Sequence, residues 1–345
     1  MENDVIKYVK FSEIDLSNSF FDSLKDDYPG FEDWFIRKSE ESAYILNEGK
    51  MRGFLYLKDE DEASNDIAPP FEKKRRLKIG TFKIDSHGTV LGERFMSIIM
   101  NEMIYGNYDE VYVTLFDKQE GLIRLFEKFG FLKWGEKSNH ELVYTKSLQV
   151  YDDIFKNYPR LKVSNANYYL LGIWPKFHTL LFPQSRLITE RDHVIQDLSF
   201  TNTIEKVYLT KMYGIENLKK NDLLIIYRTA ENGKAARFSS VATSVCTVVD
   251  YKNISEFSSF EEYSKFVGKG TIFQESELKS FWRSKDYPHV IKMIYNVALQ
   301  KRIVRDALLE KVGIDTGYAG FMKLSEEQFN KILELGEVNE SFIIN

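Results

Sequence analysis

The residues best suited to chemistry form a short polar turn, Ser86-His87-Gly88-Thr89, between two apolar stretches. Residues 77–84 are rich in bulky and β-branched side chains, and from Leu91 onward apolar residues recur at helical spacing. The expected order is therefore strand, glycine-bearing turn and helix. The first N–H groups of a helix lack partners within the helix, and the helix dipole is positive at that end. The turn is thus predicted to bind an anion, most simply a phosphate group, with an ordinary strand-to-helix connection as the alternative.

Length and composition limit the kinds of protein in which such a site can occur. The chain has 345 residues, for which two domains are the natural expectation. Hydrophobic residues make up 43% and aromatic residues 14%, so the chain can form globular cores and is not disordered throughout. The formal net charge of −5 provides no general attraction to nucleic acid, so any such binding needs a local basic surface.

Several other classes of site are excluded or disfavoured. Cys246 is the single cysteine, which rules out an intrachain disulfide and a multi-cysteine metal site. The five histidines form no pair at metal-ligand spacing, and we expect no metal. The chain contains neither a nucleophile elbow nor a phosphate-binding P-loop. The first residues lack the pattern of a signal peptide and no apolar run is long enough to span a membrane, so we expect a cytoplasmic protein without membrane contact.

The elements needed to position the turn can be read from the first part of the chain. The pattern predicts alternating strands and helices, with a charged loop before the central strand. The expected order is a strand at 5–11, a helical region at 17–42 broken at Pro29-Gly30, a hairpin within 43–57, a loop at 58–76, the central strand, turn and helix, a strand at 110–116, a helix at 120–129, and short strands near 132–135 and 142–145.

Two motifs in this part resemble the GNAT acetyltransferases. Residues His87 to Gly92 are similar to the R/Q-x-x-G-x-G/A signature of that family, with His87 in place of Arg/Gln and Val90 in place of the middle glycine. The run Leu125 to Phe131 is similar to the family's L-Y-E-K-x-G-F block in six of seven positions. The two motifs occur in the family's order, so residues 1–148 are expected to form a GNAT domain, an α/β fold with a mixed, mostly antiparallel sheet flanked by helices.

The resemblance implies acetyl-coenzyme A as the bound acyl donor. In the family, backbone amides of the turn hold the diphosphate, and the pantetheine arm lies in a gap between two strands that separate. The residues implied for this chain are Phe82, Ile84 and Thr114 beside the arm, and His87, Gly88, Thr89, Val90, Leu91 and Gly92 at the diphosphate.

The resemblance is weakest for the catalytic groups. The tyrosine that usually protonates the departing thiolate corresponds to Phe126, which has no hydroxyl. Tyr112 is a candidate to replace it, as are Tyr105 and Tyr108, with a packing or surface role as the alternative for each. Glu72 is the carboxylate nearest to the family's frequent position for a general base. Either these or other groups move the proton, or the domain binds the coenzyme without turnover.

The second half of the chain has a different character. We expect a linker at 149–176, followed at 177–345 by short strands and then helices. The run 219–228, which ends in Tyr227-Arg228, resembles the PUA-like barrels of ASCH and EVE domains. The resemblance implies that Tyr227 stacks on a base and Arg228 binds a phosphate or base edge. The alternative is that Tyr227 packs against a helix and Arg228 is a solvated strand end.

Together these observations lead to three hypotheses. The first is an acetyl-coenzyme A-dependent N-acyltransferase whose second domain selects an amine on RNA, such as aminoacyl-tRNA, as some GNAT toxins do. The second is a coenzyme-sensing protein without turnover, and the third is a protein or small-amine acetyltransferase with a structural second domain. An antitoxin or a second copy of the chain is a further expected partner of the first.

Overall fold

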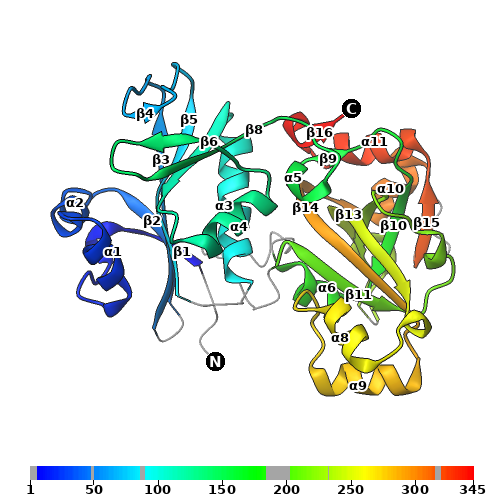
Figure 1. Ribbon diagram of the computed structural model, residues 1–345. Helices are drawn as coiled ribbons and strands as arrows, with labels where there is room; N and C mark the ends of the chain where they lie inside the picture. The colour runs from blue at the N-terminus through cyan, green and yellow to red at the C-terminus, as the bar shows by residue number, and fades with distance from the viewer. Residues whose placement is uncertain (1–5, 48–49, 86–89, 184–202, 232, 315–319) are drawn as a thin grey trace. The chain divides into compact units, whose positions relative to one another are not determined.

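The computed structural model describes residues 6–47, 50–85, 90–183, 203–231, 233–314 and 320–345. These residues divide into two compact units, unit 1 up to Gln149 and unit 2 from Val150 onward. Each unit contains a sheet flanked by helices, and most strand pairs are antiparallel. The expected α/β fold class is therefore confirmed (Figure 1).

Unit 1 is built on an eight-stranded sheet with the order β1-β2-β3-β5-β6-β8-β7-β4. The apolar alternation of its strands is that expected for a sheet covered by helices. The strands are β1 (Ile6–Lys10), β2 (Ser42–Asn47), β3 (Met51–Glu60), β4 (Ile67–Ala68), β5 (Arg76–Ile84), β6 (Glu110–Leu115), β7 (Leu132–Lys137) and β8 (Leu142–Ser147).

The parallel pair β5 and β6 is the exception within this sheet. Their pairing runs only from Arg76↔Glu110 to Ile79↔Val113, after which the two strands continue without pairing to each other. Gly80 follows directly and is passed over in the β3–β5 ladder, which shifts register there. A β-bulge bends the strand that carries it, so Gly80 lies where β5 turns away from β6.

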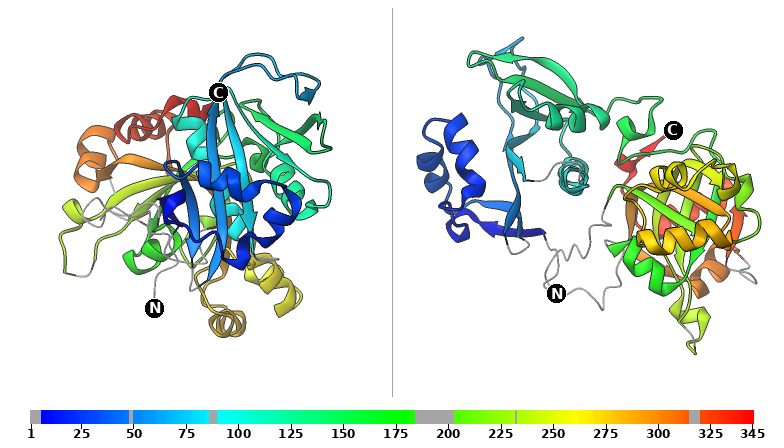
Figure 2. Two further views of the ribbon diagram at one scale, coloured as in Figure 1. Left: turned by 90° about the vertical axis from the view of Figure 1, so that its left-hand side faces the viewer. Right: turned by 60° about the horizontal axis from the view of Figure 1, so that its bottom comes forward.

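Helices cover both faces of this sheet. The pair α1 (Asp22–Asp27) and α2 (Phe31–Arg37) lies on one side, and α3 (Leu91–Tyr105) and α4 (Glu120–Lys128) lie on the other (Figures 1 and 2). Below α1 and α2, the rings of Phe11, Phe21, Phe35 and Phe54 form an aromatic core. On the opposite face, α3 approaches β3 so closely that a Cβ on Gly53 would lie 2.4 Å from the ring of Phe95. The sheet is thus held firmly from both sides.

Unit 2 contains a six-stranded sheet with the order β11-β14-β13-β12-β10-β15 and a small parallel pair, β16-β9. In β10, β12 and most of β13 nearly every residue is buried, because both faces of these strands are covered. The strands are β9 (Leu161–Lys162), β10 (Tyr168–Ile173), β11 (Glu205–Thr210), β12 (Leu223–Arg228), β13 (Val241–Asn253), β14 (His289–Val304), β15 (Phe321–Leu324) and β16 (Ile343–Ile344).

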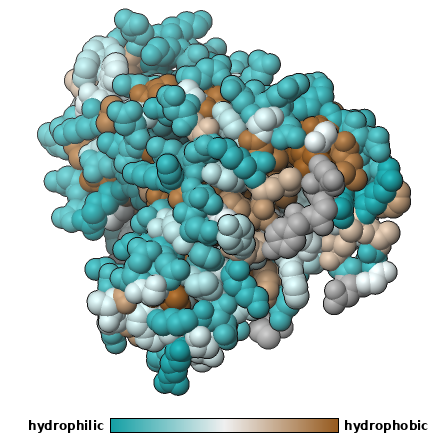
Figure 3. Space-filling model, turned by 90° about the vertical axis from the view of Figure 1, so that its right-hand side faces the viewer, coloured by the Kyte–Doolittle hydropathy of each residue, from teal (hydrophilic) through white to brown (hydrophobic). Residues whose placement is uncertain are grey.

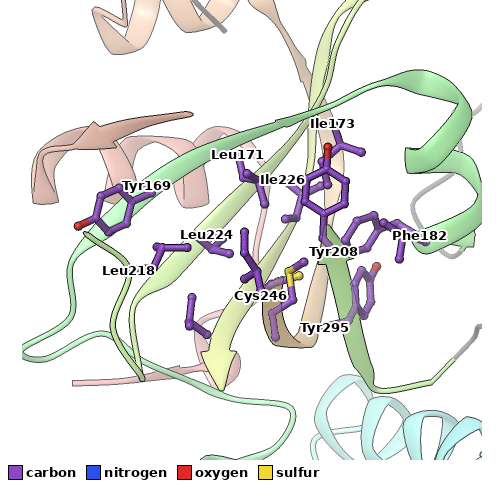
Figure 4. Close-up of a cluster of buried hydrophobic side chains, with 14 of the residues drawn as sticks. Tyr169, Leu171, Ile173, Phe182, Tyr208, Leu218, Leu224, Ile226, Cys246 and Tyr295 are labelled. Atoms are coloured by element: carbon purple, nitrogen blue, oxygen red, sulfur yellow. The ribbon is translucent and has the colours of Figure 1, made fainter. Parts of the chain in front are cut away.

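The helices of unit 2 enclose two apolar clusters. One of them gathers Cys246, Tyr208 and Tyr295 with aliphatic residues of the sheet (Figure 4). The other packs α8 and α9 against β11 and β14. The helices are α5 (Ile154–Asn157), α6 (Pro175–Leu181), α7 (Ala236–Ser239), α8 (Phe260–Val267), α9 (Glu275–Ser284), α10 (Arg305–Val312) and α11 (Glu326–Leu335).

The segment predicted as a linker, 149–176, differs from that expectation. It contains β10, which lies inside the sheet of unit 2 between β12 and β15. All six residues of β10 are buried. A strand buried on both faces shows no polar alternation, which is why the sequence pattern did not reveal it.

None of the helices in the described residues is long and apolar enough to cross a membrane. The surface in Figure 3 is mostly hydrophilic, with apolar side chains in separate patches.

Candidate active site

The predicted phosphate turn is only partly described. His87, Gly88 and Thr89 lie outside the described residues. Val90 is the N-cap of α3 and its side chain makes no capping hydrogen bond, and Leu91 begins the helix as a buried residue. The glutamate in the first turn, Glu93, is paired with Lys128 at 2.7 Å. The side chain of Val90 therefore does not cap the backbone N–H groups at the start of α3. The negative charge of Glu93 beside them is balanced by Lys128.

Gly92 has a packing role in addition to the predicted one. A Cβ at this position would lie 2.7 Å from Leu125 Cδ2 on α4 and 3.5 Å from Ile84 Cδ1. Real Cβ atoms do not approach other atoms so closely, so a larger residue at position 92 would require the half-buried Leu125 side chain to shift. Any test of Gly92 in coenzyme binding must separate binding from this packing.

A cavity of about 510 Å³ opens where β5 and β6 separate. Two of the residues predicted to lie beside the pantetheine arm, Phe82 and Thr114, line it, whereas Ile84 is not part of its described wall. The wall is completed by residues from the α1–α2 connection, α2, β3, β5, α4 and the β7–β8 turn, among them Tyr28, Trp34, Tyr56, Lys78, Gly80, Phe126 and Glu141. Because the ladder has ended here, backbone edges of two strands face the cavity without pairing to each other.

Glu141 is the most constrained acid in this wall. Its side chain is 5% exposed. One carboxylate oxygen, Oε2, accepts a hydrogen bond from Asn139 Nδ2 at 3.0 Å and lies 3.4 Å from Lys137 Nζ. The other, Oε1, accepts hydrogen bonds from Tyr28 Oη at 3.1 Å and from Thr114 Oγ1 at 3.3 Å. The carboxylate is therefore anchored through one oxygen by the β7–β8 turn and presents the other to hydroxyl groups of the cavity.

Tyr28 reaches Glu141 from the connection between α1 and α2. It precedes Pro29-Gly30, where Gly30 has φ +83° and begins α2. Its ring packs on that of Phe116, with centroids 5.5 Å apart. Burial and the neighbouring Glu141 raise the pKa of Tyr28 far above that of a free tyrosine. The phenol is therefore protonated at neutral pH and can act as a hydrogen-bond and proton donor.

The charges around the anchoring oxygen are balanced. Lys137 also pairs with Asp66 at 3.2 Å. Burial opposes the charge of Lys137, but Asp66 and Glu141 together raise its pKa. Glu141 therefore lies beside a lysine that stays charged, which compensates the cost of burying a carboxylate.

The two catalytic candidates predicted from the sequence do not meet in this cavity. Tyr112 is buried on β6 and donates a hydrogen bond to Glu60, which also pairs with Lys58 at 3.0 Å and Lys78 at 3.3 Å. Burial works against ionisation of Glu60, but Tyr112 and Lys78 outweigh it and lower the pKa. Glu72 is exposed and is absent from the described cavity wall. Its backbone carbonyl accepts a hydrogen bond from Arg76 Nη1.

Phe126 occupies the place where the resembled family has its tyrosine. The side chain is fully buried, lines the cavity and packs on Phe82 with ring centroids 6.0 Å apart. The described cavity wall instead contains a hydroxyl and a carboxylate in Tyr28 and Glu141, which no sequence pattern indicated. They are 113 positions apart, and no local pattern marks either residue.

In unit 2 the predicted nucleic-acid residues are not presented to a ligand. Tyr227 is 0% exposed in the middle of the sheet, so it cannot stack on a base, and Arg228 is buried and pairs with Glu231 at 2.8 Å. The physical reason is that β12 lies between β10 and β13 and is covered on both faces. His178 is also buried, with Nε2 2.8 Å from Thr243 Oγ1, whereas Trp174 is 70% exposed.

Within the described part of the chain, no group of three histidine, cysteine or acidic residues lies close enough to hold a metal ion. Cys246 is fully buried, and burial raises the pKa of its thiol, so it is not a reactive nucleophile.

Comparison with known proteins gives only distant similarities. No family model matches the chain, and no curated protein matches it. Among solved structures, ASCH from Zymomonas mobilis is 9% identical, with 49% of this chain and 94% of that chain covered and a TM-score of 0.30. A chain of the NatC complex bound to Gag peptide and coenzyme A is 18% identical, with 41% and 96% covered and a TM-score of 0.28. The N-acetyltransferase PseH of Campylobacter jejuni is 11% identical, with 42% and 99% covered and a TM-score of 0.27. Similarities of this size assign no function to the chain.

Proposed function

We propose that unit 1 is an N-acyltransferase that transfers an acetyl group from acetyl-coenzyme A to a primary amine. The observation that carries this proposal is the separation of β5 and β6 after Ile79↔Val113, with a cavity of about 510 Å³ at that point. An extended pantetheine arm carries amide groups, and the backbone edges of separated strands are suited to hydrogen-bond them. The bulge at Gly80 lies where the thioester would reach the cavity.

The rest of the wall suits the acceptor half of the reaction. An amine attacks a thioester only when it is uncharged, so a site for this reaction needs a base for the ammonium proton and a donor for the leaving thiolate. Glu141 and Tyr28 are a carboxylate and a protonated phenol in the same wall. When both reactants are bound in one cavity, they react without the entropic cost of meeting in solution.

Two measurements on the full chain test this function. Calorimetry with coenzyme A tests the donor site, and release of free thiol from acetyl-coenzyme A tests transfer to a panel of peptide α-amines, polyamines and aminoacyl-tRNA. Binding together with thiol release on at least one acceptor is expected. Absence of coenzyme binding would reject the proposal.

A sensor without turnover is the second candidate, and Phe126 favours it. This residue removes the hydroxyl that the resembled family places beside the departing sulfur. Coenzyme binding without thiol release on any acceptor would support the sensor over the transferase.

The finer version of the proposal is an acceptor amine carried on RNA, with unit 2 selecting it. Acidic residues outnumber basic ones in unit 1, whereas the two are nearly balanced in unit 2, so unit 2 is the better partner for RNA. With Tyr227 buried, the exposed rings of Trp174 and Phe238 are better placed to stack on bases, and Arg237 lies 6.0 Å from the Phe238 ring. An aminoacyl-tRNA acceptor would make the protein a toxin of translation and an antitoxin its natural partner.

Trp174→Ala and Phe238→Ala test this version. Both variants are expected to slow acetylation of aminoacyl-tRNA while leaving a small-amine acceptor unaffected, because stacking contributes only to RNA binding. Equal rates on tRNA for variants and wild type would reject RNA selection by these rings, and a protein or small-amine acetyltransferase would remain.

A further inference from the structure

Phe126 leaves the cavity without the usual acid, yet the described wall holds a tyrosine and a glutamate that touch each other. Tyr28 comes from the α1–α2 connection and Glu141 from the turn between β7 and β8, and they meet above Thr114 of β6. Three separate elements thus converge on one carboxylate oxygen, Glu141 Oε1.

We propose that Glu141 and Tyr28 form the proton path of the transfer reaction, with Glu141 as general base and Tyr28 as general acid. This inference rests on the proposed function. The bond between the amine nitrogen and the acetyl carbon forms, and the bond between that carbon and the coenzyme sulfur breaks. Glu141 takes the proton that the nitrogen loses, and Tyr28 gives its phenolic proton to the sulfur.

The hydrogen bond between the two residues allows their starting protonation states to be restored after each reaction. The hydrogen bond of 3.1 Å lets protonated Glu141 return its proton to the Tyr28 phenolate. An acceptor that enters as the ammonium ion first loses one proton to solvent; from the free amine onward, a single proton moves from nitrogen to sulfur over one turnover, and both side chains are restored. No oxidant, metal or further reactant is required.

The environment of each oxygen fits this role. Asn139 and Lys137 hold Oε2, so Oε1 keeps its direction toward the cavity when its hydrogen-bond partners change. Thr114, which hydrogen-bonds the same oxygen from β6, places the base at the edge where the thioester arm is proposed to lie. Burial and Glu141 raise the pKa of Tyr28, so the phenol stays protonated until the thiolate departs, and the phenolate then formed readily takes a proton back from Glu141.

The experiment uses the full chain, acetyl-coenzyme A and two kinds of acceptor. One is the best amine of the panel above, and the other is hydroxylamine, which is small, is already uncharged at neutral pH and, as a weakly basic nitrogen, can lose its proton to water after attack more readily than an alkylamine. Glu141→Gln is expected to lower kcat for the amine by about 10² to 10⁴, but to lower the hydroxylamine rate by less than about tenfold. Tyr28→Phe is expected to slow both acceptors by about 10² to 10⁴, because the thiolate departs in either case.

Unit 1 offers a matched control. Tyr144 and Glu127 form a second Tyr–Glu hydrogen bond, at 3.4 Å, outside the described cavity wall. Tyr144→Phe and Glu127→Gln are expected to keep wild-type rates, and all four variants are expected to keep the wild-type affinity for coenzyme A by calorimetry. That affinity also shows that a slow variant is folded.

The outcomes separate the inference from the function on which it rests. Wild-type rates in Glu141→Gln and Tyr28→Phe would reject the proton path while the transfer activity stands. Equal losses with both acceptors in Glu141→Gln would show that Glu141 positions the site and is not the base. A wild type that binds coenzyme A but acetylates neither acceptor would reject the transferase itself.

Discussion

At the closed end of the gap between β5 and β6, one buried ion pair links the two strands. Replacing one of its partners by a residue of the same shape is expected to lower the stability of this part of the sheet strongly. Arg76 and Glu110 are register partners at the first parallel pair of the two strands. Their side chains are 4% and 7% exposed, and Arg76 Nε lies 2.7 Å from Glu110 Oε2. Glu110→Gln keeps the shape but leaves the guanidinium buried without its counter-charge.

Removing one partner of a buried ion pair costs about 3 to 5 kcal/mol. The exposed pair Arg124–Glu120, at 3.0 Å and one helical turn apart, provides the comparison. Glu120→Gln is expected to cost only about 0.3 to 0.5 kcal/mol. The difference follows from burial, because the geometry of the two pairs is similar.

Hydrogen exchange of the β5 and β6 amides is the suitable assay, because a chain with two units need not unfold in a single step. Glu110→Gln should lower the free energy of opening at these amides by about 3 to 5 kcal/mol. The double variant Arg76→Met/Glu110→Leu should recover part of this loss. A loss below about 1 kcal/mol, or no recovery in the double variant, would refute the reasoning.

Three further predictions concern packing and titration. Gly92→Ala is expected to shift the half-buried Leu125 side chain and to change the stability of unit 1 by less than about 1 kcal/mol; coenzyme affinity measured in Gly92→Ala and in the double variant Gly92→Ala/Leu125→Ala then separates binding from packing. Cys246 is expected to resist thiol reagents until unit 2 unfolds, since it is fully buried with a raised pKa; labelling at the rate of a free thiol in the native protein would contradict its placement. Burial, Arg228 and Arg302 lower the pKa of His178 from 6.5 to about 3. Between these two pH values, His178 is therefore protonated in the unfolded chain and neutral in the folded one. Unit 2 should therefore lose stability as the pH falls from about 6.5 toward about 3, and His178→Gln should flatten this part of its stability profile.

Local patterns were sufficient for the elements that surround the site. The strand expected at 77–84 is β5 (Arg76–Ile84), the helix expected from Leu91 is α3, and the helix expected at 120–129 is α4 (Glu120–Lys128). Each pattern reflects one buried face, which recurs every second residue in a strand and about every third or fourth in a helix. For the same reason β10, buried on both faces, was mistaken for part of a linker.

The chemistry of the cavity depended on contacts that no local pattern contains. The resemblance to the GNAT acetyltransferases implied Phe82, Ile84 and Thr114 beside the gap, of which Phe82 and Thr114 line the cavity, and the sequence itself shows that Phe126 lacks a hydroxyl. Tertiary structure alone brought Tyr28 to Glu141 across 113 positions and buried Tyr227 inside a sheet. The reason is physical: periodicity records which face of an element avoids water, whereas a proton path requires two particular atoms to come within hydrogen-bonding distance, and only the packing of several elements determines that.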